Sequence, residues 1–334
     1  MDLLRGLAIF FVLMNHIYIR LRIAKMPFHL PDALVWNGQQ GVQIFFAVSG
    51  FLITTTALRR WGAGIDIPAF YRLRFARIAP LLLLLLAILS TLDLTHAENF
   101  VINPKVATLP RALLAALTFH INVLEARHGY LPANWDILWS LSVEEVFYLV
   151  FPLVRRYTWL FIALLVTCII LGPISRTHGN EIWQEYSYLG GMDAIALGCL
   201  TALLVQKRQF SPRILVALGT PLILFTLCMY RSIGYSMTIL AIGTCLIIAA
   251  SAQTEWRAPR ILSPLLSLGR RSYEVYLTHM FVVFALVWLF RFRLVPLLFL
   301  CTIIMSGLVG ELVARVYSEP MNRYIRGVGK ITPE

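Results

Sequence analysis

Residues 1–20 read MDLLRGLAIFFVLMNHIYIR, an apolar stretch long enough to cross a bilayer as one helix. Between its charged ends, Asp2 and Arg20, this stretch carries Arg5 and His16. Ionisable groups in a membrane-spanning helix are energetically costly, and they usually mark functional positions. The stretch therefore indicates both a membrane fold and a candidate site.

Nine further apolar stretches follow in the 334-residue sequence. Hydrophobic residues make up 59% of it and charged residues only 14%, and a water-soluble fold of this size could not bury so much apolar surface. We therefore predict an all-α fold, a polytopic membrane helix bundle of about ten transmembrane helices. It forms a single domain over residues 1–334. The predicted spans are 3–20, 41–58, 78–95, 139–154, 158–174, 188–206, 214–230, 235–252, 272–290 and 294–316.

The basic residues decide the predicted orientation. The net charge is +12, but Lys and Arg occur in short clusters between apolar stretches, which is typical of membrane loops and argues against nucleic-acid binding. If residues 109–124 lie in the membrane interface without crossing, ten spans place the majority of the 29 basic residues in the cytoplasm, as the positive-inside rule requires. Both termini are then cytoplasmic.

The spacing of Arg5 and His16 places them on one face of their helix. Eleven steps of about 100° come within about 20° of three full turns, and the two positions are about 16 Å apart along the axis. We expect a cation near the inner mouth and a titratable imidazole in the outer half. The alternative for His16 is a packed core residue.

Two adjacent carboxylates, Glu144 and Glu145, lie in the predicted span that begins at Trp139. We expect them at a depth similar to that of His16. Because neighbouring residues of a helix point about 100° apart, only one of the two is expected to face that imidazole and support it as a general base. The alternative is an interfacial acidic pair.

An arginine-rich segment, predicted as an inner loop, carries Arg72, Arg74 and Arg77. Guanidinium groups bind phosphates bidentately, so the cluster could hold a phosphorylated ligand; the alternative is an ordinary positive-inside anchor. His279, about two turns into the ninth span, could line the ligand's path or pack structurally. The five cysteines lie in apolar stretches without metal-ligand spacing, so no metal site is predicted.

Together these segments resemble the acyltransferase 3 family of membrane acyltransferases. The matching pieces are Asp2–Ala8 with His16 (an Arg-x10-His motif), Phe45–Ile53, Phe70–Pro80, Trp139–Tyr148 and Ser272–His279. The resemblance implies an acyl-CoA-dependent O-acyltransferase of the bacterial cytoplasmic (inner) membrane, with no permanently bound cofactor. It implies acetyl-CoA or another acyl-CoA as co-substrate and a hydroxyl of a carbohydrate or glycoside as acceptor. It also implies that His16 is the catalytic histidine and Arg5 its motif partner.

The combined hypothesis is that Arg72, Arg74 and Arg77 hold the phosphates of acyl-CoA, with His279 beside its path. His16, supported by Glu144 or Glu145, then removes the acceptor's proton. Direct transfer and a two-step route through an acylated residue both remain open. The rival class is a transporter or flippase of a glycan, lipid or drug, since intramembrane charges in a ten-span bundle suit transport as well. A non-catalytic membrane scaffold is a further alternative.

Overall fold

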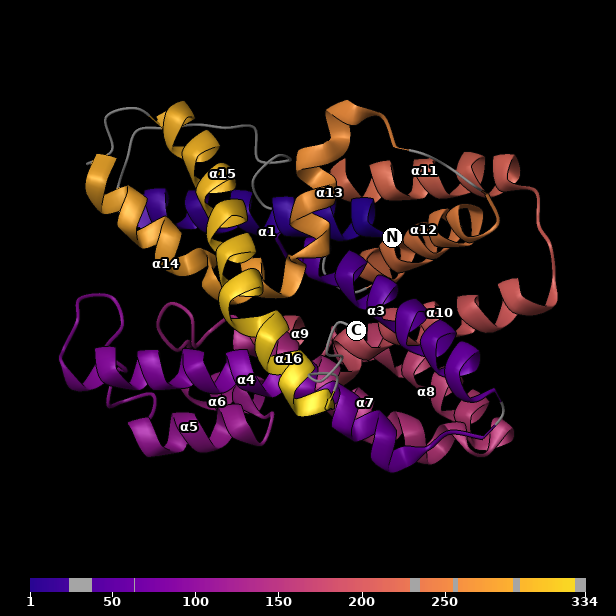
Figure 1. Ribbon diagram of the computed structural model, residues 1–334, viewed down its shortest axis with the longest axis horizontal. Coiled ribbons are helices and arrows are strands. Elements are labelled where there is room, and N and C mark those ends of the chain that lie inside the picture. The colour runs from indigo at the N-terminus through magenta and orange to yellow at the C-terminus, as the bar shows by residue number, and fades with distance from the viewer. Residues whose placement is uncertain (24–37, 63, 229–234, 255–257, 291–294, 328–334) are drawn as a thin grey trace, which may run out of the picture.

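The computed structural model describes residues 1–23, 38–62, 64–228, 235–254, 258–290 and 295–327, and these form a helical bundle without strands (Figure 1). The all-α prediction is confirmed. The long helices are α1 (Asp2–Ile23), α3 (Gly38–Trp61), α4 (Ile67–Leu94), α7 (Leu138–Arg155), α8 (Thr158–Ser175), α10 (Tyr188–Lys207), α11 (Pro212–Cys228), α12 (Tyr235–Ala252), α14 (Ser272–Phe290) and α15 (Val295–Val313). The shorter ones are α5 (Leu109–Leu117), α6 (Ile121–His128), α9 (Glu181–Tyr186), α13 (Ser263–Arg270) and α16 (Glu319–Arg326).

Every predicted span coincides with one of the ten long helices. Over the described part of the chain, eight helical segments are long and apolar enough to cross a membrane. The other two are α7, which contains two glutamates and an arginine, and α11, which has only 17 residues. Residues 229–230 and 294 of the predicted spans lie outside the described residues, as do residues 328–334. The count of ten and the cytoplasmic termini therefore stay predictions.

The arginine-rich segment is helical, which corrects its prediction as a loop. Helix α4 begins at Ile67, because Pro68 occupies its first turn and the Asp66 carboxylate accepts a hydrogen bond from the Ala69 amide at 3.0 Å. The segment Phe70–Pro80 forms the next turns of this helix. Its arginines therefore point in fixed directions.

Residues 109–124 fall in two short helices, α5 and α6. With nine and eight residues, each is well under half as long as the hydrocarbon core is thick. Neither helix can cross a bilayer alone. In Figure 1 both lie beside α4 at one end of the bundle, with α11 and α12 at the other.

Two glycines allow α1 and α13 to cross in backbone contact. A Cβ on Gly6 would lie 2.0 Å from the Leu265 carbonyl oxygen, and a Cβ on Gly269 would lie 1.8 Å from the Asp2 carbonyl oxygen. Any side chain here would push the helices apart, since such distances are far below van der Waals contact. The crossing fixes the first turn of α1 and therefore the position of Arg5.

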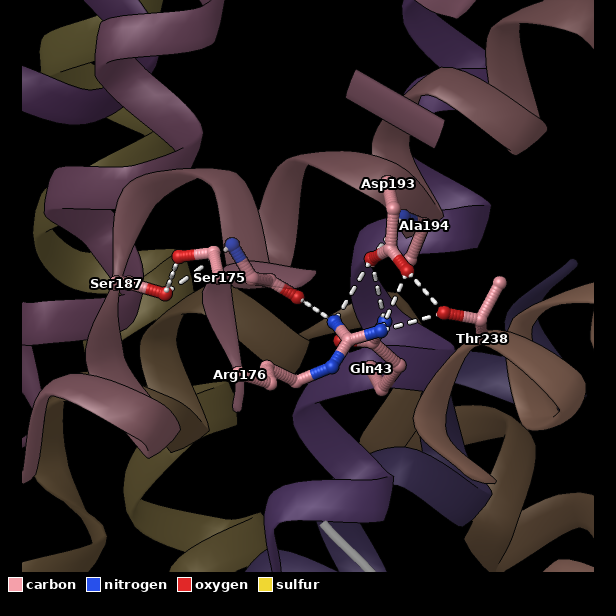
Figure 2. A network of polar contacts seen from close by, with 8 residues as sticks. Gln43, Ser175, Arg176, Ser187, Asp193, Ala194 and Thr238 are labelled. Carbon is pink, nitrogen blue, oxygen red and sulfur yellow. Dashed lines mark hydrogen bonds and ion pairs between the residues drawn. The ribbon is translucent and has the colours of Figure 1, made fainter. Parts of the chain in front are cut away.

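A buried ion pair joins four helices at another crossing (Figure 2). Arg176, at the end of α8, donates to the Asp193 carboxylate of α10 at 2.7 Å, and both side chains are almost fully buried. Thr238 of α12 donates to the same carboxylate at 2.6 Å, and Gln43 of α3 at 2.9 Å. Asp193 thus connects α3, α8, α10 and α12. Glu311, another acid within a predicted span, binds Arg271 and Arg315.

Candidate active site

Three neighbouring cavities follow the face of α1 that carries Arg5 and His16. An inner cavity of about 180 Å³ lies at Arg5. A neck of about 40 Å³ follows at Ala8 and Val12. An outer cavity of about 610 Å³ lies at His16. The shared face predicted from the eleven-residue spacing is therefore confirmed.

The cavities adjoin one another through common walls. The inner cavity and the neck are both lined by Glu144 of α7 and Tyr273 of α14. The neck and the outer cavity share Val12 of α1 and Tyr276 of α14. The neck is almost wholly apolar, so it separates the cationic inner cavity from the polar outer one.

The inner cavity collects three arginines from two helices, namely Arg5, Arg74 and Arg77. Arg5 lies over the Phe45 ring, 5.5 Å from its centroid, and its Nε is buried without a hydrogen-bond partner among the described residues. Arg77 is partly exposed, and its nearest carboxylate oxygen, on Glu274, is 4.0 Å away. The carboxylates of the protein therefore compete little with an incoming anion for these two guanidinium groups.

Arg72 does not join this cluster. It is exposed, and it is absent from the lining of the inner cavity. The reason is helical geometry, because residues two apart on α4 point about 200° apart. The arginines that line the inner cavity are thus Arg5, Arg74 and Arg77, and not the predicted set of Arg72, Arg74 and Arg77.

The two glutamates bind Arg74 rather than His16, which corrects the predicted pairing. Glu145 accepts from the Arg74 guanidinium at 2.5 and 3.0 Å, and Glu144 lies 3.4 Å from the same group. Glu144 also accepts from the Tyr148 hydroxyl at 2.8 Å. Of the two, only Glu144 lines the inner cavity and the neck.

The predicted pairing fails because the two glutamates and His16 lie at different levels of the helix bundle. The outer cavity at His16 is lined by Asp136, Ile137 and Trp139, which precede or begin α7. The N-terminal end of α7 therefore lies near His16 of α1. Glu144 lies more than a turn deeper, toward Arg5.

The partner of His16 is a second histidine. Nδ1 of His16 lies 3.1 Å from Nε2 of His279, and the ring centroids are 4.9 Å apart. His279 is fully buried, and its Nδ1 lies 2.6 Å from the carbonyl oxygen of Tyr276. His279 thus lies behind His16 and lines none of the three cavities. The acyl-CoA path itself stays a prediction.

The hydrogen bonds assign the tautomers of both rings. A carbonyl oxygen only accepts, so Nδ1 of His279 carries a proton, and Nε2 of the neutral ring is an acceptor. Nδ1 of His16 must then be the donor in the contact between the rings. Nε2 of His16 keeps its lone pair, and His16 lines the outer cavity. This is the protonation state that a general base requires.

The sequence alone did not single out Tyr276, Asp136 or Trp139, which all line the outer cavity. Tyr276 lies one helical turn before His279 in the segment Ser272–His279, and that spacing was an available signal. Asp136 and Trp139 lie at the start of α7, and no sequence pattern connects them to His16. Among the described residues, no group of three or more His, Cys, Asp or Glu side chains could hold a metal ion.

Comparison with known proteins places this arrangement in a family. A family model described as an acyltransferase domain, that of acyltransferase 3, matches residues 1–315. The chain belongs to the acyltransferase 3 family. The acyltransferase 3 match covers all three cavities and both histidines.

The relatives of this chain include bacterial O-acetyltransferases. It is 25% identical to the O-acetyltransferase OatA of Staphylococcus aureus over 343 aligned residues, which cover 90% of this chain and 55% of the relative. It is 26% identical to the peptidoglycan O-acetyltransferase OatA of Listeria monocytogenes over 294 residues, covering 77% and 47%. The chain thus spans about half the length of the curated relatives it matches. No solved structure matches it.

Proposed function

We propose that this chain is a membrane O-acyltransferase that moves an acyl group, acetyl in the simplest case, from acyl-CoA to a hydroxyl of a carbohydrate acceptor. The observation that carries the proposal is the row of cavities from Arg5 to His16. One end offers cations for phosphates, the middle is apolar, and the other end offers a base. The names of the relatives favour an acetyl group and a glycan.

The donor fits the inner side of this row. Acyl-CoA has a phosphorylated head and a long, thin arm that ends in the thioester. Arg5 and Arg77 bind the phosphates, since Arg74 is already neutralised by its two glutamates. The arm extends past Ala8 and Val12 through the neck, which must widen to admit it. The cytoplasm supplies the donor in this arrangement.

The chemistry takes place at Nε2 of His16. The acceptor hydroxyl donates to this nitrogen, loses its proton to it as the oxygen attacks the thioester carbonyl, and forms the new ester. The carbon–sulfur bond breaks, and the departing thiolate takes the proton back from the imidazolium. The transfer needs no reactant other than acyl-CoA and the acceptor. A positioned base contributes about 10²–10⁴-fold to such a transfer.

Purified protein in lipid nanodiscs, given acetyl-CoA labelled in the acetyl group and an oligosaccharide acceptor, tests the proposal. We expect label to move to the acceptor with the native protein and not with His16→Ala, provided that the variant elutes as a folded monodisperse species. Label that stays on CoA with the native protein overturns the proposal. Glycan uptake into proteoliposomes without acyl-CoA would support the transporter alternative instead.

A further inference from the structure

A pair of carboxyl groups that the transfer step does not use lies at the wall of the outer cavity. Glu125 of α6 is fully buried, and its Oε1 accepts from the Leu131 amide at 2.9 Å. Its Oε2 finds no donor among the described residues, and its carboxyl group contacts that of Asp136. Two carboxyl groups can hydrogen-bond only when one of them holds a proton, so the pair shares one.

Burial favours this shared proton at neutral pH. Both residues lie outside the membrane-spanning segments. Burial raises the pKa of Asp136 to about 7, and burial together with the Asp136 charge raises the pKa of Glu125 well above its usual value. Glu125 is fully buried, whereas Asp136 faces the cavity and accepts from the Tyr186 hydroxyl, so Asp136 is the member of the pair placed to ionise.

Only one member of the pair reaches the cavity. Asp136 lines it and accepts from the Tyr186 hydroxyl at 3.1 Å, whereas Glu125 is not among the lining residues. Asp136 also accepts the proton that it shares with Glu125, so the lone pairs that remain beyond the Tyr186 and Glu125 bonds are left for a ligand. The titratable and charged groups around Asp136 come from α6, the 129–137 loop, α9, α1 and α14; they are Glu125, Tyr130, Glu185, Tyr186, His16, Arg20 and Tyr276.

Flat aromatic rings form the wall beside this carboxyl. The Trp139 and Tyr186 rings stack with centroids 4.2 Å apart and planes at 7°, and the Tyr130 ring meets Tyr186 edge-on at 6.0 Å. Tyr130 is half-exposed. An aromatic wall with a carboxylate at its edge matches a sugar ring, which has apolar C–H faces and hydroxyls around its rim. A carboxylate can accept from two adjacent hydroxyls at once.

We propose that Asp136, backed by the protonated Glu125, binds adjacent hydroxyls of a carbohydrate ring packed on Trp139 and Tyr130 in the outer cavity. This inference rests on the proposed function, because it assigns the acceptor's subsite. It makes Asp136 a specificity-determining residue and Glu125 a positioning residue. Asp136 binds hydroxyls best when ionised, so acceptor affinity falls as the pH drops below about 7.

Binding of carbohydrate is measured first without any donor, so that this inference and the transfer reaction can fail separately. The probes are β-linked gluco-, galacto- and N-acetylgluco-oligosaccharides, and the readout is quenching of tryptophan fluorescence in nanodiscs. We expect at least one probe to bind the native protein, and Asp136→Asn to weaken it at least tenfold. Glu181→Gln, an exposed acid of α9 outside the cavity lining, is the matched control and should bind normally.

The pH profile separates a binding role from a structural one. In the native protein the dissociation constant should rise below about pH 7, and in Asp136→Asn it should be flat. Glu125→Gln keeps an uncharged donor to Asp136, so it should bind with a pH profile close to that of the native protein. Affinity of Asp136→Asn for acetyl-CoA should be unchanged.

Three results overturn the inference: no probe binds the native protein, Asp136→Asn binds within twofold of it, or the native pH profile is flat. Carbohydrate binding without acetyl transfer leaves this subsite standing and removes the proposed function. Acetyl transfer by the native protein, together with an unchanged KM for the acceptor in Asp136→Asn, supports the proposed function and overturns the subsite. Each outcome thus decides one of the two statements.

Discussion

His16 and His279 are 263 positions apart in sequence, yet Nδ1 of one lies 3.1 Å from Nε2 of the other. The Tyr276 carbonyl holds the His279 ring in place, and that ring in turn holds His16. A neutral imidazole thus does the orienting for which we predicted a carboxylate. A neutral partner stabilises the imidazolium less than a carboxylate would. The main effect of His279 is therefore on which nitrogen of His16 carries the proton and on where the His16 ring points.

Replacing His279 should lower the turnover number without weakening donor binding. In His279→Ala, His16 loses its contact with the second ring and keeps only its hydrogen bond to the Val12 backbone, so its ring is held less firmly. We expect kcat to fall about 10–100-fold, as for other residues that orient a reacting group, and the Kd for acetyl-CoA to stay within twofold. Steady-state kinetics and equilibrium binding measure the two.

The His279 prediction has two internal controls. His279→Gln presents an amide oxygen near the position of Nε2 and should recover part of kcat. In the double variant with His16→Ala, the second change should cost nothing further, because a positioning residue acts only through the residue it positions. Additive losses would indicate an independent role for His279.

The inner arginines should differ from Arg72 in donor binding. Arg77→Gln and Arg5→Gln each remove a cation that lines the inner cavity, whereas Arg72→Gln removes one that does not. We expect the first two to raise the KM for acetyl-CoA about tenfold, corresponding to one charge-assisted hydrogen bond of about 1.5 kcal/mol. Arg72→Gln should leave it unchanged. Equal effects of all three would mean that overall positive charge, and not this cavity, attracts the donor.

Gly269→Ala should destabilise the protein through the crossing of α1 and α13. The new methyl group meets the Asp2 backbone, which cannot rotate away as a side chain can. We expect a loss of about 1–3 kcal/mol, typical of overpacking. Thermal denaturation in detergent should show a lower midpoint. Gly64→Ala, where a Cβ meets nothing within 4 Å, is the matched control and should melt like the native protein.

Asp193→Asn should be more damaging than loss of a surface ion pair. It leaves the buried Arg176 guanidinium without its counter-charge, and breaking a buried pair costs about 3–5 kcal/mol. Arg315→Gln breaks the exposed Arg315–Glu311 pair and should cost about 0.2–1 kcal/mol. Expression level and melting temperature should rank the variants in that order. An unperturbed Asp193→Asn would show that the contacts in Figure 2 do not stabilise the bundle.

Local sequence pattern predicted the parts of the site that lie on one helix. The eleven-residue spacing of Arg5 and His16 placed both on the cavity side of α1, because the helical repeat fixes direction within a helix. The same rule, applied to the segment containing Arg72 and Arg74, would have separated these two residues. A loop has no such fixed repeat, and Pro68 in the first turn is the sequence signal that marks the segment as a helix.

Apolar stretches of membrane length determined that this chain is a helical bundle, since a helix satisfies its own backbone hydrogen bonds and needs no partner to be predicted. The tertiary structure alone decided which helices meet and at what level. The register between α1 and α14 gave His16 a histidine neighbour, and the register between α4 and α7 gave Arg74 both glutamates. Such registers follow from side-chain packing and from close backbone crossings such as Gly6 with Gly269, which involve residues far apart in the sequence.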